Sequence, residues 1–95
     1  MTFSLKPSDS FAPHTEAVES RLGEETVILH LESGIYFGLD AVGTVVWERL
    51  QAGDSLEEIC KQVKDAYEDA PDTVDDDIFT FLTQLLEHSL IEHRS

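Results

Sequence analysis

Residues 26–47 read TVILHLESGIYFGLDAVGTVVW, and the spacing of the apolar residues changes once within this stretch. As far as Leu39 the β-branched and aromatic residues follow a period of two, which is typical of β-strands. After Asp40 the apolar residues recur every three or four positions, which is typical of an amphipathic α-helix. The stretch therefore predicts that a region of strands ends near Asp40 and that a region of helices begins there.

Three segments with the alternating pattern precede Asp40, and they predict an antiparallel meander of three strands. They are AVESRL (17–22), TVILHL (26–31) and IYFGL (35–39). Ser33 and Gly34 form a turn dipeptide at hairpin distance between the last two segments. In the third segment, Phe37 and Leu39 are expected to face the core.

Three segments with helical periodicity follow the strands. They are DAVGTVVWERLQAG (40–53), SLEEICKQVKDAYEDA (55–70) and TVDDDIFTFLTQLLEHSL (73–90). Asp40, Ser55 and Thr73 are the predicted N-caps, the last two with an acidic residue three positions later. Pro71 is expected to end the second helix. Strands followed by helices predict an α+β fold with the helices packed on one face of the sheet.

The 95 residues are enough for one domain, which we place at residues 16–95. Residues 1–15 contain Pro7 and Pro13 and show little periodicity, so an irregular N-terminal arm is expected. The formal net charge of −14 opposes binding to nucleic acid and to anionic membranes. The sequence shows neither a signal peptide nor an apolar stretch of membrane-spanning length, so a cytoplasmic location is expected.

The triplet of Asp54, Ser55 and Leu56 raises one specific alternative. Acyl carrier proteins are small and acidic, and they are modified on the serine of an Asp-Ser-Leu triplet at a helix start. Ser55 and Glu58 also have the S-x-x-E spacing of a capping box, and the segments before them lack the amphipathic helix that a carrier requires. Helix capping is the favoured interpretation, and a modified Ser55 is the less favoured one.

The other polar and nucleophilic residues form no recognisable catalytic pattern. The aspartates at 75–77 suit the first turn of a helix, and Cys60 lies on an apolar helix stripe as a buried thiol would. The histidines do not have the spacing of zinc ligands. They are expected at the surface or in the tail, and they are His14, His30, His88 and His93. The sequence therefore predicts a protein that is not an enzyme and that holds no cofactor and no metal. The third helix lacks Lys and Arg, which argues against DNA binding.

The third predicted strand would make an unusual sheet edge. IYFGL (35–39) carries neither charge nor proline, which commonly protect edge strands from pairing. A peptide added there would gain main-chain hydrogen bonds, whereas cover by the N-terminal arm or by a helix is an equal alternative. Phe79 lies off the main apolar stripe of the third helix, on a flank with Asp75, Asp76 and Thr83. It either packs at the edge of the core or lines a groove beside the strand.

The segments LESGIYFGLDAVGTVVWERLQAGDSLEEI (31–59) and DDDIFTFLTQLLEHSLI (75–91) resemble the PqqD-like family. Members of this family are peptide-recognition domains, also called RiPP recognition elements, and the resemblance covers about residues 16–92. It rests on the order and spacing of these residues: Gly34, Tyr36, Leu39, Gly43, Trp47, Asp77, Ile78, Phe81, Leu82 and Leu85.

The resemblance implies a winged helix-turn-helix-like fold and a non-catalytic adaptor that binds the leader peptide of a ribosomally made precursor. The leader would add as a strand on the third strand and lie against the third helix. Carried over by position, the strand edge is Ile35, Tyr36, Phe37, Gly38, Leu39 and Asp40, and the helix wall is Asp75, Asp76, Phe79 and Thr83.

The resemblance also implies a partner enzyme. The PqqD of pyrroloquinoline quinone synthesis has a Tyr-Pro-Glu-Gly turn where this chain has LESG (31–34), and the chain is more similar to the free-standing recognition protein of lasso-peptide pathways. There the partner is a separate leader peptidase. The alternatives are a chaperone for a radical-SAM peptide-modifying enzyme and a plain winged-helix module with a folded partner. A monomer or a weak dimer is expected.

Overall fold

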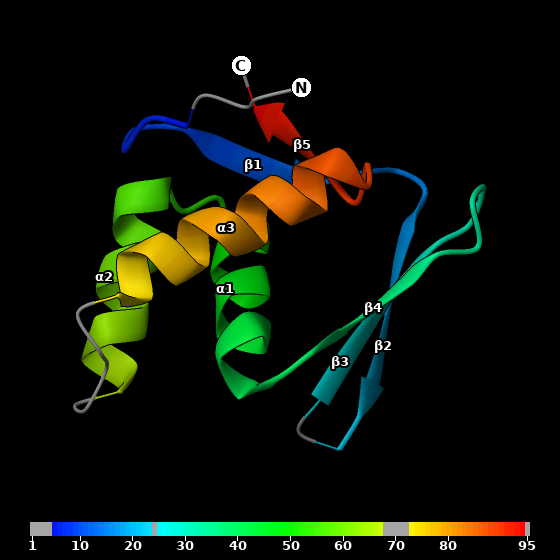
Figure 1. Cartoon of the computed structure of the whole chain (residues 1–95), viewed down its shortest axis with the longest axis horizontal. Helices are drawn as coiled ribbons and strands as arrows, with labels where there is room; N and C mark the ends of the chain where they lie inside the picture. The colour runs from blue at the N-terminus through cyan, green and yellow to red at the C-terminus, as the bar shows by residue number, and fades with distance from the viewer. Residues whose placement is uncertain (1–4, 24, 68–72, 95) are drawn as a thin grey trace.

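The strands predicted between residues 17 and 39 form an antiparallel sheet in the computed structural model, which describes residues 5–23, 25–67 and 73–94 (Figure 1). The strands β2 (Ala17–Leu22), β3 (Glu25–His30) and β4 (Tyr36–Leu39) lie in the order β2-β3-β4. The turn before β4 uses Gly34 at φ +73°, a left-handed conformation that glycine adopts without strain. The predicted meander is confirmed.

The predicted helices follow the sheet as α1 (Ala41–Gln51), α2 (Leu56–Ala66) and α3 (Val74–Glu87). Figure 1 shows the three helices together on one side of the β2-β3-β4 sheet. The α+β class, with a three-stranded antiparallel sheet followed by three helices, is therefore confirmed. The predicted stop at Pro71 lies outside the described residues, and α2 has already ended at Ala66 with Tyr67 as its C-cap.

Two of the three predicted N-caps form side-chain cap bonds. An Asp40 side-chain oxygen accepts the N–H of Gly43 at 2.8 Å, and Ser55 forms a reciprocal capping box with Glu58. For the third helix the predicted N-cap position, Thr73, is confirmed, but Thr73 makes no side-chain cap bond and has φ −84° and ψ 2°. A capping side chain needs an extended backbone at the cap position, and Thr73 does not have one.

The N-terminal arm is more ordered than expected. β1 (Ser10–Pro13) pairs antiparallel with β5 (Ile91–Arg94), and Phe11 is fully buried. The arm also completes the start of α2, where the N–H of Leu56 donates to the Asp9 carbonyl at 2.7 Å. The expectation of an irregular segment is therefore wrong for residues 10–13, while the domain division at residue 16 stays a prediction. Pairing between chain segments so far apart leaves no local pattern that could reveal it.

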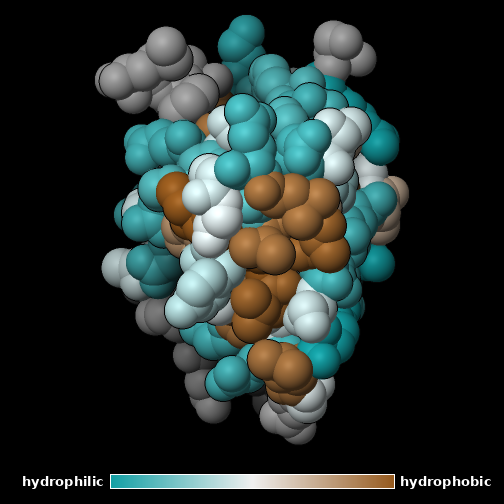
Figure 2. Space-filling model, turned by 90° about the vertical axis from the view of Figure 1, so that its right-hand side faces the viewer, coloured by the Kyte–Doolittle hydropathy of each residue, from teal (hydrophilic) through white to brown (hydrophobic). Residues whose placement is uncertain are grey.

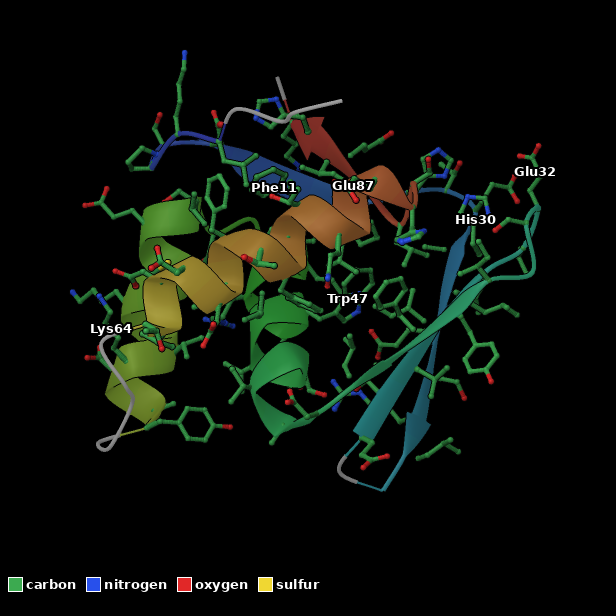
Figure 3. All side chains as sticks on the ribbon, viewed as in Figure 1. Phe11, His30, Glu32, Trp47, Lys64 and Glu87 are labelled. Atoms are coloured by element: carbon green, nitrogen blue, oxygen red, sulfur yellow. The ribbon has the colours of Figure 1, made fainter. Side chains whose placement is uncertain are left out.

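The core lies where α1 meets the sheet and the other two helices. Trp47 is buried, and its indole N–H donates to Glu19 of β2 at 2.6 Å, so α1 is attached to the sheet (Figure 3). Thr44 of α1 and Thr26 of β3 form a second, buried hydrogen bond at 3.2 Å. Buried apolar side chains from every helix and from four strands complete the core: Phe11, Ile28, Leu39, Val46, Leu50, Leu56, Ile59, Val63, Val74, Ile78, Leu82, Leu85, Leu90 and Ile91.

His30 corrects the expectation that the histidines lie at the surface or in the tail. Its ring is buried at the end of β3, where Nδ1 accepts the N–H of Ser33 at 3.2 Å. The same residue holds both sides of the hairpin through its main chain, because its N–H donates to the Ile35 carbonyl and its carbonyl accepts the N–H of Gly34. His30 therefore fixes the turn that leads into β4.

Candidate functional site

β4 is an open edge of the sheet. Among the described residues it has a hydrogen-bonded neighbour on one side only, β3. The N-terminal arm, which could have covered this edge, pairs with β5 instead through residues 10–13. The alternative of a strand covered by that part of the arm is therefore excluded.

The pairing register shows which main-chain groups face outward. The His30 N–H donates to the Ile35 carbonyl at 2.8 Å, so this pair is a hydrogen-bonded one. Hydrogen-bonded and non-bonded pairs alternate along antiparallel strands, so Phe37 and Leu39 also direct their main-chain groups to β3. Tyr36 and Gly38 direct theirs away from the sheet. The open edge thus offers the N–H and C=O groups of Tyr36 and Gly38.

A groove of about 530 Å³ runs beside this edge, between β4 and α3. Its walls are Gly38, Leu39 and Asp40 on the strand side and Val74, Asp77, Ile78 and Phe81 on the helix side, and α1 forms its floor through Val42, Gly43 and Val46. Side chains that point inward from an added strand would enter this groove, because alternate residues of a strand face the same side.

Gly43 lies in the groove floor where a side chain would be tightly placed. A Cβ atom at this position would lie 3.3 Å from the Cβ of Leu39 and 3.6 Å from the Phe81 ring. The first distance is tighter than ordinary van der Waals contact, so a side chain would displace β4 or fill the groove. Gly43 thereby lets the start of α1 approach both β4 and α3.

Two carboxylates, those of Asp40 on the strand side and Asp77 on the helix side, line the groove. Asp40 and Asp77 are exposed, and within the described part of the chain neither forms an ion pair. The described lining residues include no Lys, Arg or His. The groove thus has an apolar floor and two carboxylates, Asp40 and Asp77, on its walls.

The predicted site residues divide into two groups. The structure brings Gly38, Leu39 and Asp40 to the groove and places Ile35 and Tyr36 exposed at the strand start, while Phe37 is half-buried against the core. On α3, however, Asp75, Asp76 and Phe79 line a different hollow of about 580 Å³, between α2 and α3. Thr83 points along the same flank and donates to the Phe79 carbonyl at 2.9 Å. Their contact with a peptide stays a prediction. The flank of α3 that lies beside β4 is a different one.

The helix residues that do line the β4 groove are Val74, Asp77, Ile78 and Phe81, which the predicted site left out. A signal was available, because residues four apart share a helix face, and Asp77 and Phe81 have this spacing. Both also belong to the run that carries the family resemblance. Helical periodicity singled out the flank that carries Phe79, but only the tertiary packing decides which flank faces the strand.

The hollow between α2 and α3 has mixed charge. The Lys64 ammonium lies 2.8 Å from Asp75 and lowers the pKa of that carboxyl, and Lys64 lies on α2 away from the sheet (Figure 3). Burial, with the nearby Asp75 charge, raises the pKa of the Cys60 thiol to about 11. A thiol with this pKa is protonated near neutral pH and is a poor nucleophile.

Ser55 is engaged as a helix cap. Its Oγ accepts the N–H of Glu58 at 3.2 Å, and the Glu58 carboxylate accepts the Ser55 N–H at 2.9 Å. Ser10 of β1 also forms a β-bridge to Ser55, so the N-terminal arm lies across this helix start. The arrangement supports capping over modification of this serine.

The outer face of the β2-β3-β4 sheet, opposite the helices, is apolar and exposed. Val18, Leu29 and Tyr36 are neighbours across the three strands, and Tyr36 is 71% exposed. Leu31 extends this face toward the hairpin, and Leu22 lies at its other end. Figure 2 shows the resulting apolar band, bordered by hydrophilic residues. A continuous exposed apolar area of this kind is typical of protein interaction surfaces.

Two further properties concern the described residues only. They contain no group of three or more His, Cys, Asp or Glu residues placed to hold a metal ion. None of the helices is long and apolar enough to cross a membrane.

Comparison with known proteins identifies relatives of this chain. Residues 25–91 match the family model described as coenzyme PQQ synthesis protein D (PqqD). One similar solved structure, TbiB1 in complex with the TbiA(beta) leader peptide, is 36% identical, with 88% of this chain and 98% of that chain covered and a TM-score of 0.78. Another, a lasso peptide synthetase B1 complexed with the leader peptide, is 23% identical, with 87% and 98% covered and a TM-score of 0.77. The comparison with curated proteins finds no match.

Proposed function

The chain belongs to the PqqD family, and from this premise we propose that it is a non-catalytic adaptor for a ribosomally made precursor peptide. It binds the leader segment of the precursor as an added β-strand and delivers the precursor to a separate processing enzyme. The observation that carries the proposal is the open edge of β4 beside a groove, in a chain 36% identical to a protein solved with a leader peptide.

The leader would bind through both its main chain and its side chains. Its main chain would exchange hydrogen bonds with Tyr36 and Gly38, whose groups face the open edge, and this supplies affinity that does not depend on sequence. Every second side chain would enter the groove against Val42, Ile78 and Phe81, and this supplies specificity. The peptide-binding segment is then Ile35 to Asp40, together with the flank of α3 that carries Asp77 and Phe81.

The outer sheet face supports the second half of the proposal, the delivery to an enzyme. The apolar band around Leu29 is on the opposite side of the sheet from the groove, so a partner protein could pack on it while the leader is bound. Tethering the precursor next to an enzyme raises its effective concentration there, which is how a protein without catalytic groups accelerates a reaction. The resemblance to lasso-pathway recognition proteins supports a leader peptidase as that enzyme.

Amide hydrogen exchange measured by NMR tests the binding mode directly. The probe is a synthetic peptide with the leader sequence of a precursor encoded beside this protein. Upon saturation, exchange at Tyr36 and Gly38 should slow strongly, because their N–H groups become hydrogen-bonded. Exchange at Phe37 and Leu39 is already slow in the free protein, since these groups bond to β3, and should change less.

The pattern of protection separates strand addition from other modes. Slowed exchange confined to α2 and α3, with unchanged rates at Tyr36 and Gly38, would contradict strand addition and would direct attention to the hollow at Phe79. A peptide of the same composition in scrambled order serves as the control, and equal protection by both peptides would contradict recognition of a leader.

A further inference from the structure

Asp40 and Asp77 on the groove walls indicate a chemical property of the bound peptide that the family match does not give. We infer that the leader segment lying along β4 carries a lysine or arginine whose charged group reaches between Asp40 and Asp77. The inference rests on the proposed function, because it assumes that a leader strand occupies this groove. It assigns Asp77 as the residue that selects a basic leader.

The groove has the chemistry that a long basic side chain requires. Val42, Val46 and Phe81 offer apolar surface for its aliphatic stem, and the carboxylates of Asp40 and Asp77 line the same groove. Lys and Arg side chains commonly lie in this way, with the stem on apolar surface and the charge at a polar rim. An apolar leader residue would fill the same floor but would leave both carboxylates without a partner.

The two carboxylates differ in their present engagement. One oxygen of Asp40 accepts the N–H of Gly43 at 2.8 Å as the cap of α1, and the other oxygen can still accept a bond. Asp77 makes no side-chain hydrogen bond to the described residues. Asp77 is therefore the better partner for a cation and the better target for mutation.

No Lys or Arg of the described residues lines this groove, and three of them are paired elsewhere. Arg21 pairs with Glu19 and Glu48, Arg49 with Asp54, and Lys64 with Asp75. The last of these pairs lies at the hollow between α2 and α3. The net charge of −14 adds a long-range attraction for a basic peptide and a faster encounter at low salt.

A matched pair of variants separates the local effect from the overall charge. Asp77→Asn removes one negative charge at the groove, and Glu87→Gln removes one at an exposed position elsewhere on α3. Affinity for the synthetic leader peptide is measured by calorimetry with each protein. We expect Asp77→Asn to weaken binding roughly 3- to 10-fold, the range for a charge-assisted contact at a partly exposed site, and Glu87→Gln to weaken it less than about 2-fold.

A double-mutant cycle then identifies the peptide residue. Each Lys or Arg of the leader is replaced in turn by norleucine, which keeps the stem and removes the charge. One replacement should weaken binding to the wild-type protein at least as much as Asp77→Asn does. Combined with that variant it should cause a smaller loss, because only the contact with Asp40 is then left to remove.

The outcomes separate this inference from the proposed function. If the wild-type protein binds the leader but Asp77→Asn and Glu87→Gln have equal effects, the basic-residue inference is overturned and strand addition stands. The inference is also overturned if Asp77→Asn and every norleucine replacement lower the affinity independently of each other. A leader that binds but contains no Lys or Arg overturns it as well. A wild-type protein that fails to bind the leader overturns the proposed function and this inference with it.

Discussion

The ring of Phe37 on β4 packs against the imidazole of His88 at the end of α3, with ring centroids 5.1 Å apart and planes inclined at 55°. This contact joins the strand to the helix at one end. At the other end, Leu39 and Asp40 lie beside the groove, across from Asp77 and Phe81. The C-terminal end of α3 thus lies at the start of β4, and the first turns of α3 lie across the groove from the end of β4.

The first prediction concerns the outward N–H of Gly38. Gly38→Pro should weaken leader binding at least about 10-fold, because proline has no N–H to donate and its ring would stand against an added strand. The fold should persist, since this N–H makes no bond to β3. Gly38→Ala is the matched control and should bind within about 2-fold, because it keeps the N–H and a Cβ at this position meets nothing within 4 Å.

Calorimetry measures both affinities for the Gly38 variants, and circular dichroism melting checks the fold. Equal affinity for Gly38→Pro and Gly38→Ala would contradict a hydrogen bond from residue 38 to the leader. If proline lowers the melting temperature too far, a leader peptide N-methylated opposite Gly38 gives the same test from the other side.

The second prediction compares the two flanks of α3. Phe81→Ala removes part of the groove wall and should weaken leader binding about 10-fold, in line with the loss of a central apolar contact. Phe79→Ala alters the other hollow, and its effect should be smaller. Calorimetry with the two proteins decides which flank binds the peptide. A larger loss in Phe79→Ala would restore the helix wall first predicted from the sequence.

The third prediction concerns the outer face of the sheet. Leu29→Ser should leave leader affinity within about 2-fold, because Leu29 points away from the groove, but it should slow processing by the partner enzyme at least about 5-fold. Stability should change by less than about 1 kcal/mol at this half-exposed position. A cleavage assay with the precursor and the candidate peptidase measures the rate, and Gln62→Ala on α2 serves as the control. Unchanged cleavage would show that the enzyme does not use this face.

The fourth prediction concerns Ser55. Ser55→Ala should destabilise the protein by about 1 kcal/mol, the usual cost of losing a serine cap, and should not change leader affinity. Thermal melting at neutral pH measures the loss. Intact mass after coexpression with a phosphopantetheinyl transferase should be unchanged for the wild-type protein. A mass increase that Ser55→Ala abolishes would establish the carrier role instead.

The same capping box predicts a pH dependence. The hydrogen bond from the Ser55 main chain, followed by that from its hydroxyl, holds the pKa of Glu58 below its ordinary value of 4.5. A lowered pKa in the folded state means that the carboxylate stabilises the fold above pH 4.5 and that this contribution is lost as the pH falls through the lowered pKa. The difference in melting temperature between wild type and Glu58→Ala should therefore be largest at neutral pH and should shrink in acid.

Local patterns in the sequence predicted most of the fold. The alternation around Ile35–Leu39, the cap at Asp40 and the glycine turn at Gly34 each act within a few residues, and the structure confirms all three. The pairing of β1 with β5 joins segments at opposite ends of the chain, so periodicity within either segment could not predict it. Thr73 occupies the N-cap position, but its ψ of 2° is not the extended backbone that a side-chain cap requires, and the residue type alone does not reveal this angle.

Only the strand half of the candidate site could be predicted from the sequence. The edge strand follows from its own residues, since an uncharged strand at the end of a meander has an unpaired side. The helix wall depends on how α3 is rotated about its axis relative to β4. This rotation decides whether Phe79 or Phe81 faces the strand. That rotation is set by the burial of Ile78, Leu82 and Leu85 together, which is a property of the assembled core.

The register of Ser10 with Arg94 brings the first and last strands of the domain side by side, on a ribbon separate from the β2-β3-β4 sheet. A surface linker attached at either end of the domain would therefore leave from the same region. Immobilisation at one end and then at the other should give the same leader affinity, so the geometry of attachment is a free choice for anyone who builds a capture reagent from this domain.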